Sequence, residues 1–128
     1  MEIVSNTRIR PEEIFSLIDS GKSGSVVFHF AVVRGTTGDK ETSLVEFHPA
    51  KSDSETKEEL HQISEEIRKK WEVDDVLIIR AMGKLGVGDV MSLVAVSSPR
   101  SKAAFEASHW GVDQLKEMKT LKKQEIFR

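Results

Sequence analysis

The chain has 128 residues, of which 38% are hydrophobic and 31% charged, and its formal net charge is −2. This length suits one ordinary domain with a single core, so we expect residues 1–128 to form one domain. Because the chain contains no cysteine, it has no disulfide, no cysteine-bound metal and no thiol nucleophile of its own. Its start lacks the apolar run of a signal peptide, and no apolar stretch approaches the roughly 20 residues that span a bilayer. We therefore expect a cytoplasmic protein that does not contact a membrane.

The first half of the chain predicts a short helix, two strands and a long helix. Pro11 favours the first position of the short helix. The segment Ser25–Val33 is rich in valine and phenylalanine and predicts a strand. Its apolar residues occur at odd and even positions alike, so we expect this strand at the centre of a sheet with both faces covered. Thr42–His48 predicts the next strand. The run Ser52–Glu55 has capping-box spacing, and apolar residues spaced three and four apart continue that helix to Trp71.

The second half predicts two more strands and another long helix. Val76–Met82 and Val90–Ser97 are strands joined by a tight glycine-rich connection. Ser98 predicts the N-cap of a helix that runs to Met118, and Glu125–Phe127 predicts a short edge strand. The residues that we expect this helix to bury are Ala104, Phe105, Val112 and Leu115. The resulting order, α-β-β-α-β-β-α, predicts an α+β fold: a two-layer sandwich whose antiparallel-rich sheet is covered by helices.

The glycine and histidine patterns predict neither a nucleotide site nor a metal site. Gly83, Gly86 and Gly88 lack the dinucleotide-binding order, and a strand rather than a helix follows them. Gly21-Lys22-Ser23 looks like the end of a phosphate-binding loop, but Ser16 stands where the first glycine of such a loop belongs. The four histidines show none of the spacings of metal ligands. We therefore expect no metal and no resident cofactor.

Charge is distributed unevenly along the chain. Residues 39–75 carry 12 acidic and 6 basic side chains, whereas residues 100–128 carry 4 acidic and 7 basic ones. The basic excess includes a cluster of lysines: Lys116, Lys119, Lys122 and Lys123. These lysines either complement a helix C-terminus and solvate the surface, or they form a site for a small anion. A net charge of −2 argues against nucleic acid as the ligand.

Seven motifs occur in a fixed order over nearly the whole chain and resemble those of one known family. They are Gly24–Arg34, Leu44–His48, Arg68–Trp71, Gly83–Asp89, Ala104–Ala107, Asp113–Lys116 and Lys123–Glu125. The series resembles the large, catalytic subunit of molybdopterin synthase (MoaE-type). The most specific part is Ala-Phe-Glu-Ala followed by Asp-x-Leu-Lys and a second lysine, because both lysines stand at the spacing of that family.

This resemblance implies a sulfurtransferase of molybdenum cofactor biosynthesis. The sulfur donor would be a small ubiquitin-like subunit with a C-terminal Gly-Gly thiocarboxylate. The acceptor would be cyclic pyranopterin monophosphate, which becomes the dithiolene molybdopterin. The resemblance also implies a homodimer, and a heterotetramer with two small subunits. We expect the apolar dimer surface at the strands around Val90–Val96. The absence of cysteine fits this chemistry, since the sulfur belongs to the partner.

The resemblance also assigns roles to individual residues. Lys116 would lie at the thiocarboxylate, and Lys123 would move protons or stabilise intermediates, so both would be catalytic. Arg34 would bind the substrate phosphate, and Arg100 and Ser101 would complete the substrate-binding site. Partial burial of these lysines would lower their pKa toward neutrality and suit such roles.

Departures from the family pattern leave two alternatives open. Arg100-Ser101 and Arg80-Ala81 each stand where the family usually has His-Arg, and Thr120–Lys122 replaces a Pro-x-Trp segment. Arginine keeps a positive charge but does not release a proton at neutral pH. One alternative is therefore a catalytically impaired family-derived protein that binds a ubiquitin-like sulfur carrier without turnover. The other is an unrelated α+β module that binds RNA or a nucleotide through its terminal lysines.

Overall fold

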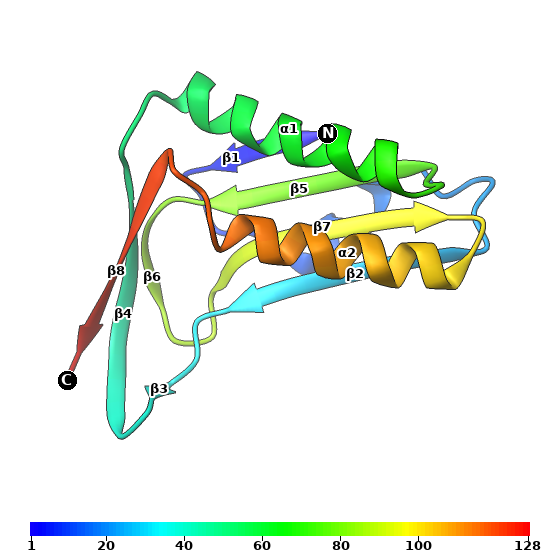
Figure 1. Ribbon diagram of the computed structural model, residues 1–128. Coiled ribbons are helices and arrows are strands. Elements are labelled where there is room, and N and C mark those ends of the chain that lie inside the picture. The colour runs from blue at the N-terminus through cyan, green and yellow to red at the C-terminus, as the bar shows by residue number, and fades with distance from the viewer.

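The computed structural model describes residues 1–128, and its strands form two sheets, the second standing across one end of the first (Figure 1). The first sheet contains, in spatial order, β1 (Glu2–Ser5), β5 (Asp75–Ala81), β7 (Val90–Ser98) and β2 (Ser25–Val32). The second sheet contains β3 (Thr36–Thr37), β4 (Lys40–Pro49) and β6 (Gly83–Gly86), and β8 (Leu121–Phe127) also pairs with β4. Only β1 and β5 pair in parallel.

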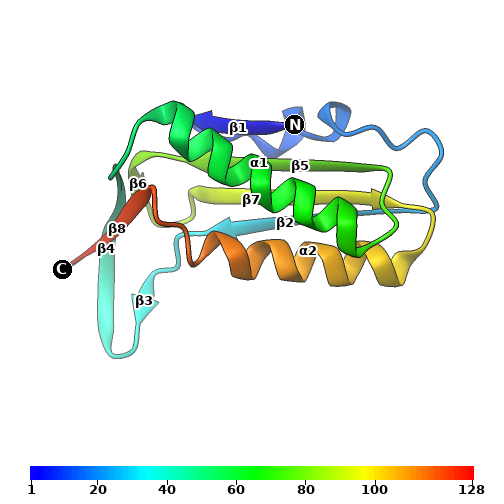
Figure 2. The same cartoon turned by 45° about the horizontal axis from the view of Figure 1, so that its top comes forward.

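Two α-helices, α1 (Asp53–Lys70) and α2 (Ser101–Leu115), lie side by side on one face of the first sheet, as Figure 2 shows. Two short 3-10 helices, η1 (Pro11–Glu13) and η2 (Phe15–Leu17), precede β2. The buried side chains beside them pack against the other face of the sheet; they are Ile9, Ile14 and Ile18. The predicted α+β sandwich is therefore confirmed. No helix of the chain combines the length and apolar character needed to cross a membrane.

Strand β5 separates two hydrophobic clusters. Leu77 and Ile79 point into a cluster of 15 buried residues that joins the two sheets and the N-terminal segment. Val76 and Ile78 point into a cluster of 9 buried residues beneath the two helices. Because side chains alternate along a strand, Arg80 belongs to the helix side of the sheet.

Helix α1 forms where its local sequence predicts. The hydroxyl of Ser52 accepts a hydrogen bond from the Glu55 backbone N–H at 3.2 Å, and the Glu55 carboxylate lies 3.5 Å from the Ser52 backbone nitrogen. This capping box starts the helix. Leu60 and Ile67 are fully buried along its inner face, so the predicted spacing of apolar residues is confirmed.

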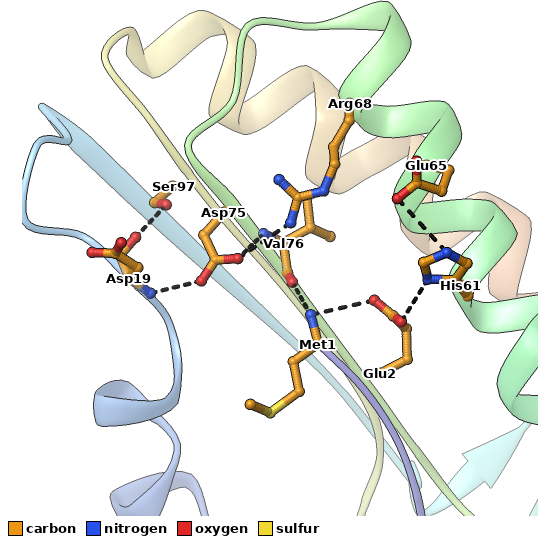
Figure 3. Close-up of polar contacts among 9 residues, drawn as sticks. All are labelled: Met1, Glu2, Asp19, His61, Glu65, Arg68, Asp75, Val76 and Ser97. Atoms are coloured by element: carbon orange, nitrogen blue, oxygen red, sulfur yellow. Dashed lines mark hydrogen bonds and ion pairs between the residues drawn. The ribbon is translucent and has the colours of Figure 1, made fainter.

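Polar contacts fasten the N-terminal segment to the first sheet and to α1 (Figure 3). Nδ1 of His61 on α1 lies 2.9 Å from Oε1 of Glu2 on β1. The carboxylate of Asp75 accepts a hydrogen bond of 2.7 Å from the Asp19 backbone N–H and forms an ion pair of 3.3 Å with Arg68. These contacts hold β1, β5 and α1 in one arrangement.

Strand β2 lies at the edge of its sheet, and the prediction of a central position is wrong. The central strands are β5 and β7. Apolar residues on both faces of a strand report what covers those faces, but they carry no information about pairing along the hydrogen-bonding direction. Val90–Val96 lies in β7 and is largely buried, so the predicted dimer surface there is also wrong.

Helix α2 is shorter than predicted, and it begins later. Ser98 stays in β7, where its hydroxyl donates to the Glu72 carbonyl at 2.7 Å and accepts from the Arg100 N–H at 3.1 Å. Arg100 is the N-cap residue, and the helix ends at Leu115, before the predicted Met118. The polypeptide then turns away to form β8.

The buried face of α2 is built from small side chains. Ala104 and Leu115 are buried as predicted, but Phe105 is 64% exposed. A Cβ atom at Gly111 would lie 3.2 Å from Val94 Cγ1 and 3.3 Å from Ile67 Cδ1. The helix therefore lies close to the sheet.

Three further segments differ from the sequence expectations. The predicted helix at Pro11 is two 3-10 turns. The glycine-rich connection contains the strand β6, which pairs with Leu44–Phe47 of β4. The short strands β1 and β3 are not predicted at all, because their stability comes from pairing with β5 and β4.

Candidate functional site

A pocket of about 500 Å³ opens where the two sheets meet the end of α2. Three of the five predicted site residues line it, namely Arg34, Lys116 and Lys123, and we call it the cationic pocket. Its walls include apolar side chains of β2, β4 and α2. Because these three cations come from distant parts of the chain, the fold alone brings them together.

Arg34 is held at the pocket by the turn between β6 and β7. The backbone N–H of Val33 donates to the Asp89 carbonyl at 2.9 Å, and the Gly88 N–H donates to the Val33 carbonyl at 2.8 Å. Gly88 has a φ of 88°, a left-handed conformation that favours glycine. Val33 is buried, so the neighbouring Arg34 is anchored at its backbone while its side chain is exposed.

Lys116 directly follows the last turn of α2. It is the C-cap residue, and the preceding Leu115 is buried beneath the helix. The free carbonyl groups at a helix C-terminus favour a cation there. At this location the Lys116 ammonium group complements the free carbonyl groups at the helix C-terminus, and it also lies at the pocket.

Side chains alternate in direction along β8, and this alternation places Lys123 at the pocket. Lys123 pairs with Phe47 of β4, and Glu125 pairs with Val45 two residues further on. Both Lys123 and Glu125 line the pocket. Residues between and beside them point to the other face of the sheet. Gln124 accordingly contacts His48 at 3.2 Å outside the pocket.

Glu125 is a pocket residue to which sequence analysis gives no role. Its Oε2 accepts hydrogen bonds from the Thr37 hydroxyl at 2.6 Å and the Thr42 hydroxyl at 2.7 Å. These hydrogen bonds, aided by the charges of Lys123 and Arg34, lower the pKa of Glu125 below its usual value. One ionised carboxylate thus stands among three cations. The sequence could have indicated this role, because Glu125 stands two residues after Lys123 and residues two apart on a strand point to the same face.

The three cations of the pocket are free of ion pairs. Lysine and arginine side chains form ion pairs elsewhere in the chain: Arg68–Asp75, Lys69–Glu66, Arg100–Glu72 and Lys102–Glu106. Arg34, Lys116 and Lys123 take part in none of them. Both pocket lysines are exposed in the single chain, so the expected partial burial is not found. Lys116 lies past a helix end and Lys123 lies on an edge strand, and neither position is covered by another element.

Arg100 and Ser101 lie at the opposite end of α2 from the pocket. This helix has 15 residues, so its two ends are roughly 20 Å apart. The Arg100 side chain is exposed and lies 4.0 Å from the Glu72 carboxylate. Within one chain, these two residues therefore do not join the cationic pocket.

Lys119 also lies outside the cationic pocket. It lines a groove between α1 and α2 together with Glu59 and Trp110. Its backbone N–H donates to the Glu59 carboxylate at 2.8 Å, which fixes the loop before β8. No group of three or more His, Asp or Glu side chains is arranged to hold a metal ion.

The sequence and the fold match those of known proteins. The family model described as "MoaE protein" matches residues 4–118. The molybdopterin synthase catalytic subunit of Bacillus subtilis (strain 168) is 30% identical over 124 residues, which is 97% of this chain and 78% of that protein. The crystal structure of molybdopterin synthase from Staphylococcus aureus superposes with a TM-score of 0.89 at 28% identity, covering 98% of this chain and 90% of that one.

A third match concerns the fold alone. The complex of subunits 1 and 2 of molybdopterin-converting factor from Helicobacter pylori contains a chain with a TM-score of 0.72 at 12% identity. That match covers 99% of this chain and 85% of the other.

The fold is thus that of a molybdopterin synthase large-subunit type of protein. The family match spans most of the chain, and this chain belongs to the MoaE protein family. The family predicted from the seven sequence motifs is confirmed.

Proposed function

We propose that this protein is the catalytic subunit of a molybdopterin synthase. It transfers sulfur from a thiocarboxylated small subunit to cyclic pyranopterin monophosphate and so forms molybdopterin. The observation that carries this proposal is the convergence of Arg34, Lys116 and Lys123, none of them in an ion pair, on one pocket. Family membership and the named relatives support the same activity.

The chemistry of the pocket suits two anionic reactants. A thiocarboxylate arrives as an anion. Its sulfur bonds to the pterin, water then breaks the acyl carbon–sulfur bond and supplies the oxygen, and the tail leaves as a carboxylate. The site therefore holds a negative charge both when the tail enters and when it leaves. A lysine ammonium is a compact charge with three donors and suits the reacting end of the tail. The arginine fork of Arg34 matches two phosphate oxygens of the substrate. Since the chain has no cysteine, the sulfur comes from the partner.

Lys116 and Lys123 are the proposed catalytic residues. Lys116 neutralises the end of the tail, and Lys123 stabilises charge and moves protons as sulfur passes to the pterin. Glu125 stabilises the wall of the pocket by accepting hydrogen bonds from Thr37 and Thr42. Arg100 and Ser101 remain proposed substrate-binding residues, acting from a second copy of the chain because they lie far from the pocket of their own copy.

The proposed partner is a small ubiquitin-like subunit whose Gly-Gly tail enters the cationic pocket. The Helicobacter pylori complex joins two different subunits of molybdopterin-converting factor, which supports such an assembly. A flexible tail loses conformational freedom on binding, and the cations offset that cost. Removing the two terminal glycines should therefore weaken binding at least about tenfold. We also propose the cytoplasm as the compartment, which the composition favours.

We propose a homodimer at the core of the assembly. Strand β2 is an unpaired edge, Val32 at its end is 47% exposed, and Phe105 on α2 is 64% exposed. Exposed apolar side chains beside an open strand edge favour association. Sedimentation should show a dimer at micromolar concentration, and a monomer would contradict this assembly.

One reaction tests the proposed activity. The protein is mixed with the thiocarboxylated small subunit and cyclic pyranopterin monophosphate, and dithiolene product is measured. The control reaction contains the same subunit with an ordinary carboxylate end. Product in the first reaction alone supports the proposal. Stable capture of the partner without product would instead favour the impaired-binder alternative.

A further inference from the structure

Arg80 is a buried cation without a counter-charge. It is the last but one residue of β5, and only 7% of its surface is exposed. Its Nε has no hydrogen-bond partner, and its side chain forms no ion pair. Its guanidinium carbon lies 4.1 Å from the centre of the Phe47 ring. Burying an unpaired charge is unfavourable, so this arrangement needs a reason.

Arg80 lies next to the cationic pocket along the first sheet. Its partner on β7 is Ser92, and the partner of Ser92 on β2 is Ala31. Ala31 lines the pocket. Paired residues point to the same face of a sheet, and neighbouring strands are about 4.8 Å apart. The Arg80 backbone is thus about 10 Å from the pocket wall, with only a serine between them.

A second connection runs through the other sheet. The Arg80 guanidinium lies over the ring of Phe47, and Phe47 on β4 pairs with Lys123 on β8. Paired residues point to the same face of a sheet, so Arg80 lies on the same side of the second sheet as Lys123. Two independent sets of strand pairings thus place the unpaired charge beside the cationic pocket.

The charge of Arg80 is permanent and poorly screened. Burial lowers the pKa of Arg80 to about 10, which still leaves the guanidinium protonated at neutral pH. Interactions of buried charges are screened by salt far less than those of surface charges. Its field therefore extends into the neighbouring pocket.

We propose that Arg80 is a positioning residue whose buried charge draws the anionic end of the partner tail into the cationic pocket. This role rests on the proposed function. Arg34 lies exposed on the loop after β2 and suits the phosphate of the second substrate, whereas a charge buried beside the pocket favours the anionic end of an inserted chain. Arg80 acts through the field and does not touch the reacting atoms.

The proposal predicts an unusual effect on stability. Replacing Arg80 by methionine removes an unpaired charge and keeps similar length and volume. Such replacements of buried charges by apolar residues are often neutral or stabilising. Arg80→Met should therefore unfold at the same temperature as the unmodified protein, or higher. If Arg80 instead stabilised the fold, Arg80→Met would have a lower unfolding temperature than the unmodified protein.

The test compares binding of the small subunit in two forms, one ending in a Gly-Gly carboxylate and one ending in a Gly-Gly amide. The unmodified protein should bind the carboxylate form more tightly. Arg80→Met and Arg80→Gln should each reduce that preference about tenfold, while Arg80→Lys should keep most of it. The exposed Arg10 forms no ion pair, and the control Arg10→Met should leave the preference unchanged.

Each other result decides the question. An unchanged preference in Arg80→Met overturns the role of Arg80 and leaves the proposed function intact. Failure of both neutral variants to fold assigns Arg80 to the fold and overturns the role as well. Equal binding of the two tails by the unmodified protein contradicts the proposed function itself, and the role of Arg80 with it.

Discussion

Lys116 and Lys119 are three residues apart in the chain yet line different cavities. Lys116 faces the cationic pocket with Lys123, whereas Lys119 faces the groove between α1 and α2. The separation arises because α2 ends at Leu115 and the chain then turns into β8. Two lysines of similar exposure and sequence context thus form a matched pair for testing function.

Lys116→Arg separates binding from catalysis. Arginine keeps the positive charge at the end of α2, so the variant should bind the small subunit as the unmodified protein does. The planar guanidinium fork, however, replaces the compact ammonium group that lies at the reacting end of the tail. Sulfur transfer should therefore fall at least about tenfold, as product formation under saturating partner would show. Full activity would mean that charge alone is required of Lys116.

Glu125→Gln should change the pH dependence of stability. The two threonine hydrogen bonds lower the pKa of Glu125 in the folded protein, so its ionised form stabilises the fold. That contribution is complete above the ordinary value of 4.5 and is lost as the pH falls through the lower folded value. The unmodified protein should have a higher unfolding temperature than the variant at pH 6, and this difference should shrink toward pH 3. Glu12→Gln, at an exposed site, is the control, and equal curves for all three proteins would refute the role of Glu125.

The pair of His61 and Glu2 predicts the opposite dependence (Figure 3). The hydrogen bond to Glu2 raises the pKa of His61 above 6.5. Its stabilising contribution is therefore complete below pH 6.5 and is lost as the pH rises through the folded value. His61→Ala should have a lower unfolding temperature than the unmodified protein at pH 5.5, and the two temperatures should approach each other at pH 8.5. Glu2→Gln should abolish this difference, and its persistence in that background would argue against the pairing.

Gly111→Val should move α2 away from the sheet. The new side chain meets Val94 and Ile67, where even a Cβ atom is tightly packed. Overpacking of this kind costs roughly 1–3 kcal/mol of unfolding free energy. Sulfur transfer should also fall, since α2 carries Lys116. His109→Val places the same residue on the exposed face of the helix and should cost about 0.5 kcal/mol or less. Equal stability of the two variants would show that α2 is not held by this close contact.

Sequence reasoning succeeded where local chemistry determines the outcome. The capping box at Ser52 predicts the start of α1, and the spacing of Asp113–Lys116 and Lys123 predicts the family. The edge position of β2 was not predictable, because it depends on which strands pair. The roles of Glu125 and Arg80 depend on contacts with Thr42 and Phe47, which only the folded chain creates.

Alanine substitution at each of the four C-terminal lysines tests the central claim most directly. If these lysines only solvate the surface, Ala at positions 116, 119, 122 and 123 should behave alike, each within about 0.5 kcal/mol of the unmodified protein in stability. If the cationic pocket transfers sulfur, Lys116→Ala and Lys123→Ala should lose most product formation while folding normally. Lys119→Ala and Lys122→Ala should stay nearly active. Full sulfur transfer by Lys116→Ala and Lys123→Ala would contradict the assignment of the pocket as the active site.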